Sequence, residues 1–281
     1  MADTGTSHGP RHLALGRVVL TVKNLDAVQA FYERAVGLHV LRRDGDRVEL
    51  GVGDAVLLEL RRDASARVRS PREAGLFHTA FLLPSRADLG RWVKHAAATR
   101  APVVGASDHA VSEAIYLSDP EGNGVEIYVD RPAATWRRNG HEVEMTTEQL
   151  DIDDLVAQAG ARAWAGFPEG STVGHVHLQV GAIPPAEAFY AGVLGFDLTC
   201  RYPGGSFYAS DGYHHHLATN VWNSRGAGPR ELPSTGLAEV EIRADRSRIE
   251  AVRQRATDAA GDGERLVLRD PWGTSVALVA H

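Results

Sequence analysis

The stretch LGRVVLTVKNLDAVQAFYERAVGL, residues 15–38, is matched later in the chain by VGHVHLQVGAIPPAEAFYAGVLGF, residues 173–196. Each stretch opens with strand-like alternation, passes through a short turn and continues with helical spacing into the sequence Phe-Tyr-x-x-x-x-Gly. Phe31 and Phe189 are 158 positions apart, and so are Arg17 and His175. The chain therefore contains an internal repeat, and its two halves are expected to fold alike.

The later segments of the two halves also match each other. DPEGNGVEIYV (residues 119–129) and DPWGTSVALVA (270–280) each combine Asp-Pro and a glycine, which predicts a tight turn followed by a strand. GLFHTAFLLP (75–84) and GLAEVEIRA (236–244) are also strand-like, and a helical stretch follows each. Each half is thus predicted to contain strand–helix–strands twice, which makes the fold class α+β.

The segment between the repeats has a different composition. Residues 132–170 contain RPAATWRRNG and then TTEQLDIDDLVAQAGARAW, where Thr146 or Thr147 could cap one short helix. We therefore expect a disordered N-terminus over residues 1–12, a first domain over 13–131, a linker over 132–170 and a second domain over 171–281.

Composition excludes several classes of protein. The chain has 281 residues, 43% of them hydrophobic, and a net charge of −6, so we expect neither disorder nor a nucleic-acid partner. The single cysteine, Cys200, excludes an internal disulfide and a thiolate zinc cluster. The sequence has no apolar run of about 20 residues and no signal peptide in residues 1–12. These features predict a cytoplasmic protein without a membrane partner.

The repeated pattern resembles the vicinal oxygen chelate superfamily, which includes glyoxalase I, extradiol ring-cleaving dioxygenases and bleomycin-resistance proteins. The resemblance rests on the first strand, the FYxxxxG helix and the DPxGNxxE ending, and it covers both halves. Within the superfamily, the chain more closely resembles catechol 2,3-dioxygenase-like proteins with two such domains. This closer resemblance rests on the stretches GLFHTAF, IYLSDPEGNGVEIY, GHVHLQV and GYHHHLATN. This resemblance implies tandem domains built from four βαβββ modules, whose mixed sheets curl around a cleft.

The resemblance also implies three metal-ligand positions in each domain, which in dioxygenases hold His, His and Glu. Such a set suits Fe(II), because it leaves positions open for the substrate and dioxygen. Neither half of this chain has a complete set. The residues at these positions are Arg17, His78 and Glu126 in the first half, and His175, Glu239 and Ala277 in the second.

The two incomplete sets are complementary. If the front module of the second domain pairs with the back module of the first, as in glyoxalase-type members, His78, His175 and Glu126 form one full site. Glu126 lies in an apolar strand, where a carboxylate is costly unless it is paired or bound to a metal. Singly, each histidine also fits a structural role, and Arg17 and Glu239 could form an ion pair in the other, inactive site.

Further histidines fit proton transfer. In SFYASDGYHHHLATN we expect a strand, so either His215 or both His214 and His216 face the cleft. The resemblance places His215 as the acid/base residue, whereas its apolar neighbours on that face favour His216 instead. His109 and Tyr116 match family residues that orient the substrate oxygens, although Asp108 stands where the family has a basic residue.

The resulting hypothesis is an extradiol dioxygenase that uses Fe(II), or alternatively Mn(II), to cleave a catechol-type diol with dioxygen. Its partners would be a small aromatic diol and dioxygen, and the sequence leaves open whether the chain forms a homo-oligomer. Two alternatives stay open. They are a glyoxalase-like metal-dependent isomerase or lyase, and a metal-free protein that binds an aromatic compound or antibiotic.

Overall fold

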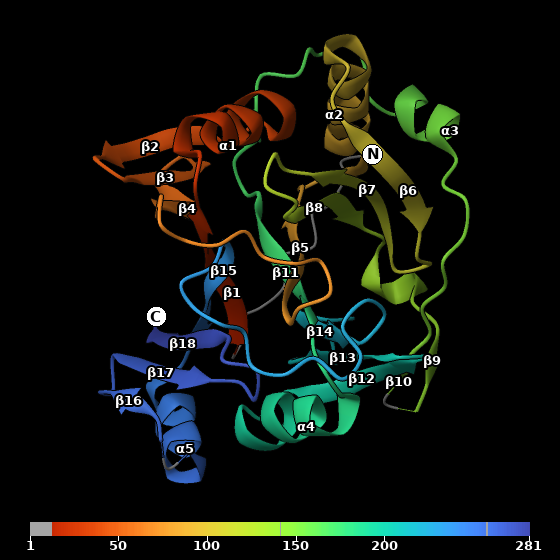
Figure 1. Ribbon diagram of the computed structural model, residues 1–281. Coiled ribbons are helices and arrows are strands. Elements are labelled where there is room, and N and C mark those ends of the chain that lie inside the picture. The colour runs from red at the N-terminus through yellow and green to blue at the C-terminus, as the bar shows by residue number, and fades with distance from the viewer. Residues whose placement is uncertain (1–12, 141, 257) are drawn as a thin grey trace.

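The computed structural model describes residues 13–140, 142–256 and 258–281, so the predicted disordered N-terminus lies outside the described residues. Two eight-stranded mixed sheets lie side by side, the first on the left and the second on the right in Figure 1. Helices α1 (Leu25–Phe31) and α2 (Arg86–Thr99) lie toward the top of this view. Helices α4 (Ile183–Glu187) and α5 (Arg246–Arg255) lie toward the bottom. The predicted α+β class is confirmed.

Four βαβββ modules follow one another along the chain. The first contains β1 (Leu13–Val22), α1, β2 (His39–Asp44), β3 (Arg47–Val52) and β4 (Ala55–Arg62). The second contains β5 (Gly75–Leu82), α2, β6 (Val103–Asp108), β7 (Ser112–Ser118) and β8 (Gly124–Asp130). The third contains β11 (Thr172–Gln179), α4, β12 (Asp197–Tyr202), β13 (Gly205–Ala209) and β14 (Leu217–Asn220). The fourth contains β15 (Gly236–Ala244), α5, β16 (Ala260–Gly261), β17 (Arg265–Arg269) and β18 (Ser275–Ala280).

The sheets combine modules from opposite halves of the chain. Within each module the first strand is parallel to the last, as β5 is to β8 and β11 is to β14. Two modules then join through their antiparallel first strands, which are β1 with β15 and β5 with β11. The first sheet therefore unites the first and fourth modules, and the second sheet unites the third and second. This is the exchange of modules that the complementary ligand sets predict.

The repeated Phe-Tyr segment forms a helix with the same local plan in the first and third modules. In the first, the Asn24 side chain accepts a hydrogen bond from the backbone N–H of Ala27 and so caps α1. A π-helical segment over Tyr32–Val36 continues the helix and ends at Gly37, whose φ of 107° favours glycine. Phe31 and Tyr32 are both buried, so this helix contributes its aromatic pair to the core.

The segment between the halves contains a short 3-10 turn (Ala133–Thr135), β9 (Arg138–Asn139), β10 (Glu142–Val143) and α3 (Ile152–Ala157). The expected helix is present, but neither Thr146 nor Thr147 caps it. The Asp151 side chain does so by accepting a hydrogen bond from the N–H of Asp154. The two threonines line a cavity instead.

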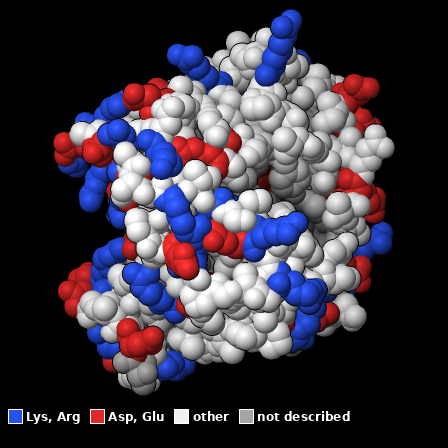
Figure 2. Space-filling view, in the orientation of Figure 1, with Lys and Arg blue, Asp and Glu red and all other residues white. Residues whose placement is uncertain are grey.

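One continuous cluster of buried apolar residues draws on both sheets and both halves of the chain. Among the described residues, every helix is too short or too polar to cross a bilayer. Acidic and basic side chains are interspersed over the face shown in Figure 2, so neither sign of charge dominates it.

Candidate metal centre and active site

Three central strands of the second sheet carry the predicted ligands. His175 on β11 lies opposite Ala80 on β5, and Ala80 lies beside Glu126 on β8. His78 is two residues from Ala80 on the same strand, so its side chain points to the same face. The second sheet therefore brings His78, Glu126 and His175 together on one face, although they come from both halves of the chain.

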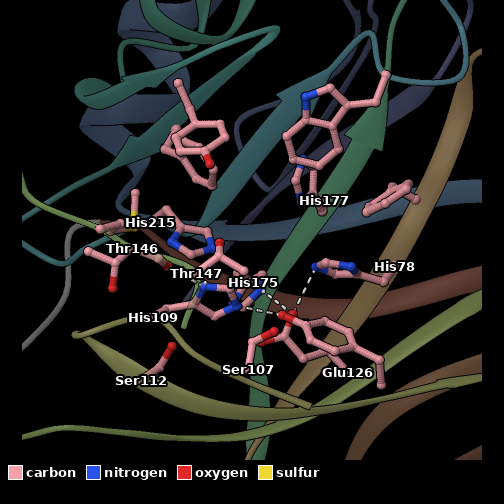
Figure 3. Close-up of a pocket in the computed structure, with 16 residues that line it drawn as sticks. His78, Ser107, His109, Ser112, Glu126, Thr146, Thr147, His175, His177 and His215 are labelled. Carbon is pink, nitrogen blue, oxygen red and sulfur yellow. Dashed lines mark hydrogen bonds and ion pairs between the residues drawn. The ribbon is translucent and has the colours of Figure 1, made fainter. Parts of the chain in front are cut away.

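The three side chains converge on a single point (Figure 3). Glu126 Oε2 lies 2.9 Å from Nε2 of His78 and 3.2 Å from Nε2 of His175. One donor atom from each residue lies within 4.8 Å of the other two, and all three residues are buried. Two imidazole nitrogens and one carboxylate at this spacing fit a divalent transition metal with open coordination positions.

The protonation states and the local packing of these residues both favour metal binding. Burial lowers the pKa of His175 to about 4, so its imidazole is in the neutral, metal-binding form at pH 7. Burial alone would raise the pKa of Glu126, but the adjacent His175 and His78 hold it well below its usual value. Gly124 lies beside His78, and a Cβ there would stand 2.1 Å from the Phe77 carbonyl oxygen and 3.0 Å from Cβ of His78. A glycine at this position makes room for the ligand.

The equivalent positions in the first sheet hold ion pairs. Arg17 Nη1 lies 3.0 Å from Glu59 Oε2, and Arg17 Nε lies 3.2 Å from Glu241 Oε2. Glu239 pairs with Arg265 at 2.7 Å rather than with Arg17, so the ion pair considered from the sequence is wrong in its partners. Ala277 offers no donor atom. A guanidinium held between carboxylates thus occupies the centre of this sheet.

His215 lines the same cavity as the three candidate ligands. Its ring centroid lies 4.1 Å from that of His175, and burial together with neighbouring imidazoles holds its pKa well below the usual value. Its Nδ1 is 2.7 Å from Nδ1 of His214, whose Nε2 is 2.8 Å from Asp130 Oδ1. If Nε2–H of His214 donates to Asp130, its Nδ1 accepts the Nδ1–H of His215. Nε2 of His215 is then left as a hydrogen-bond acceptor.

The expectation that the three histidines lie on a strand is wrong. Strand β14 begins at Leu217, so His214, His215 and His216 lie in the irregular segment before it, and the rule of alternating faces does not apply to them. The ring of His216 packs near Phe196 and Tyr213, and its Nδ1 accepts a hydrogen bond from the N–H of Ser210. It is not among the described residues that line the cavity.

His109 and Tyr116 lie together in the lining of the same cavity. Nδ1 of His109 is 2.7 Å from the Thr146 carbonyl oxygen and therefore donates to it, so Nε2 accepts the Tyr116 hydroxyl at 2.7 Å. Burial, and next Glu126, raise the pKa of Tyr116 well above its usual value, so the phenol stays protonated. Asp108, the departure from the family pattern, accepts a hydrogen bond from the N–H of Ala110 and pairs with Arg131, which shapes the turn carrying His109.

These groups line a cavity of about 440 Å³. Sequence reasoning missed several of its residues. His177 could have been found, because it is two positions beyond His175 on the same strand and so shares its face. Met145, Thr146 and Thr147 come from the linker, and no pattern in the sequence pointed to them. The other lining residues are Phe77, Ser107, Ser112, Tyr202, Phe207 and Trp222.

Comparisons with known proteins agree with this architecture. The chain is 42% identical over 233 residues to a catechol-2,3-dioxygenase of Bacillus subtilis (strain 168), an alignment that covers 79% of this chain and 80% of that protein. It is 28% identical over 164 residues to biphenyl-2,3-diol 1,2-dioxygenase 3 of Rhodococcus globerulus, an alignment that covers 55% of this chain and 84% of that protein. The fold resembles the crystal structure of glyoxalase I of Zea mays with a TM-score of 0.58 and 17% identity. The superposition covers 95% of this chain and 92% of that one.

Both halves also match one family profile. Residues 14–127 and 172–278, which together span most of the sequence, match the Glyoxalase/Bleomycin resistance protein/Dioxygenase superfamily. The matched ranges cover nearly all of the four modules of the two sheets, and the alignment with the Bacillus protein extends over most of both chains. The chain therefore belongs to the glyoxalase/bleomycin resistance protein/dioxygenase superfamily, with two tandem domains of that fold.

Proposed function

We propose that this protein is an Fe(II)-dependent extradiol dioxygenase that opens the ring of a catechol-type aromatic diol. The observation that carries the proposal is the convergence of His78, His175 and Glu126 in one cavity with two further groups able to handle protons, His215 and the His109–Tyr116 pair. The names of the Bacillus and Rhodococcus relatives support the same class of reaction.

His78, His175 and Glu126 would hold the metal. Two neutral imidazoles and one carboxylate favour Fe(II), and Mn(II) is the other metal that this set suits. Fe(II) bound there would supply a Lewis acid for the two diol oxygens and a redox centre for dioxygen. The three residues are buried, so they would also keep bulk water from the reacting atoms.

His215 would hold and move a proton beside the bound diol. The hydrogen bonds that run from Asp130 through His214 to its Nδ1 leave its Nε2 as an acceptor for a hydroxyl proton. After the ring opens, the same nitrogen can return that proton to the product. Burial and the neighbouring imidazoles hold the pKa of His215 well below its usual value, so the ring is neutral at pH 7 and Nε2 is free to take the proton that the diol releases.

Tyr116 and His109 would orient the substrate oxygens from the other side. The Tyr116 ring centroid lies 5.7 Å from that of His78, so this phenol stands next to the candidate ligands. Its contact with His109, which the Thr146 carbonyl anchors, restricts the position of the hydroxyl. Phe77, Phe207 and Trp222 supply an aromatic wall for the ring itself.

The test is to load the metal-free protein with Fe(II) under anaerobic conditions, add catechol and then admit air. We expect a yellow ring-cleavage product to accumulate with the wild-type protein and not with Glu126→Ala. Tight Fe(II) binding without any ring-cleavage product from catechol or alkylcatechols would contradict the proposal. Isomerisation of a glutathione hemithioacetal by the same preparation would favour a glyoxalase-type activity instead.

A further inference from the structure

His177 lies beside the candidate metal centre but has no part in the reaction described above. It is on β11 directly opposite His78, with 5.0 Å between the ring centroids and 89° between the ring planes. Phe77 and Trp222 lie 5.0 and 5.3 Å from its ring, and only 4% of the residue is exposed. A polar ring in such an aromatic setting needs a hydrogen-bonding partner or a use.

The hydrogen bonds of Asn220 determine which nitrogen of His177 carries the proton. Oδ1 of Asn220 accepts the backbone N–H of Trp222 at 3.1 Å, so its Nδ2 is the end that faces His177 Nε2, at 2.9 Å. An amide nitrogen can only donate, hence Nε2 of His177 accepts. The ring is therefore the tautomer that carries its proton on Nδ1.

That Nδ1–H faces the cavity. Among the described residues, Nδ1 of His177 has no hydrogen-bond partner. Unlike the unpaired side-chain nitrogens in the interior, it is accessible from the cavity. His177 is one of the residues that line the cavity, and its ring contacts those of both the candidate ligand His78 and Trp222. His177 thus presents one uncharged hydrogen-bond donor to the space beside Phe77 and Trp222. A ligand held at the metal centre would reach this donor with a substituent that extends in their direction.

The surroundings of this donor restrict the chemistry of its partner. Among the described residues that line the cavity there is neither lysine nor arginine, and the one carboxylate, Glu126, is a candidate metal ligand. A carboxylate or sulfonate on the substrate would therefore lose its hydration without gaining a cation. A neutral oxygen, such as that of an alkoxy or carbonyl group, could accept the hydrogen bond while the aromatic wall covers the carbon atoms beside it.

We propose that His177 determines substrate specificity by donating its Nδ1–H to an uncharged oxygen substituent on the ring of the diol. The inference rests on the proposed function, because it takes the diol to be held at the candidate metal centre. It predicts a preference for an alkoxy-substituted or acyl-substituted catechol over a catechol of the same shape without the oxygen.

The test compares methoxycatechol with ethylcatechol, which differ by an ether oxygen in place of a methylene group, in both ring isomers. We would measure dissociation constants anaerobically on the Fe(II)-loaded protein, and kcat/KM in air. For the isomer whose substituent reaches His177, the wild-type protein should favour methoxycatechol by about three- to tenfold, the range of a net hydrogen bond between neutral groups. The absence of a preference for either isomer in the wild-type protein would overturn the inference.

Two variants separate the donor from the shape of the side chain. His177→Gln can still bond to Asn220 but places no donor at the position of Nδ1, so the preference should disappear. His177→Asn places an amide near that position and should keep part of it. A preference that persists unchanged in His177→Gln would overturn the inference. A wild-type preference in anaerobic binding without ring cleavage would leave the inference standing and would count against the proposed function.

Discussion

His215 and His216 are neighbours in the chain but point to different parts of the molecule. His215 lines the cavity against His175, whereas His216 packs toward Phe196 and accepts a hydrogen bond from Ser210. We expect His215→Asn to retain iron and catechol affinity while its turnover falls about 100- to 10,000-fold, the usual contribution of a general acid or base. Stopped-flow or steady-state rates, normalised to measured iron content, would show this.

His216→Asn is the matched control. It changes the same residue type one position along, so it should affect stability more than the rate per bound iron. The assignment fails if His216→Asn gives the slow, iron-replete protein and His215→Asn turns over normally. Loss of iron from both variants would instead indicate that this segment supplies a metal ligand.

The candidate ligands allow a second comparison between equivalent residues. His78→Ala, His175→Ala and Glu126→Ala should each reduce bound metal from near one ion per chain to near none, because a three-ligand site loses most of its affinity with any one ligand. Glu239→Ala, at the position equivalent to His78 in the other sheet, should keep its metal. Elemental analysis after dialysis measures both, and metal loss in Glu239→Ala with none in Glu126→Ala would contradict the module exchange.

Residues differ in how far the sequence reveals them. The places of His78, His175 and Glu126 could be predicted, because the resemblance to the superfamily implies three ligand positions and the repeat shows which of them each half lacks. The direction of His215 could not be derived from alternation, because the segment before β14 is irregular. Asp130 and His214 support His215 through contacts between residues 84 positions apart, which no local pattern records.

At the scale of elements, the first sheet shows what replaces a metal centre. Arg17 bridges Glu59 and Glu241 at the position equivalent to His175. We expect Arg17→Met to lower the free energy of unfolding by about 1–3 kcal/mol, because a buried carboxylate loses a charged partner. Urea denaturation would measure it, with Arg243→Met, which removes an exposed arginine, as a control that should change stability by less than about 0.5 kcal/mol.

The same ion pairs set a pH dependence. Burial raises the pKa of Glu59, but the hydrogen bond from Arg61 and the charges of Arg61 and Arg17 outweigh it and lower that pKa. A carboxyl group with a lowered folded-state pKa contributes stability at neutral pH and loses that contribution as the pH falls through the folded-state pKa. The stability difference between the wild-type protein and Arg17→Met should therefore shrink below about pH 4. A difference that stays constant from pH 7 to pH 3 would show that Arg17 acts through packing rather than charge.

The order of the elements was open to prediction, while their ends often were not. Alternation indicates the first strand of each module, and the Asp-Pro turns mark the last strands of the second and fourth modules. The start of α3 at Asp151 depended on which of several capping side chains the chain uses, since Thr146 and Thr147 are also of a type that caps helices. Their place in the cavity follows from the path of the linker, which tertiary contacts decide.

At the scale of the whole molecule, neither half contains a complete sheet. β5 from the first half pairs with β11 from the second, and β1 pairs with β15. We expect residues 1–131 and 132–281, expressed separately, to bind Fe(II) at least about tenfold more weakly than the intact chain, because each lacks part of the ligand set. Co-expression should restore the site, as equilibrium dialysis of the copurified halves would measure. Binding by the isolated first half as tight as that of the whole chain would contradict a shared site.

In the proposed function, His78, His175 and Glu126 form the metal centre of a ring-cleaving dioxygenase. The most direct measurement is to supply catechol and oxygen-18 gas to the Fe(II)-loaded protein and to analyse the product by mass spectrometry, with Glu126→Ala treated in parallel. We expect a ring-opened product that has incorporated both atoms of the labelled gas, and no such product from Glu126→Ala. A product that lacks the label, or labelled product formed equally by Glu126→Ala, would contradict the proposed function.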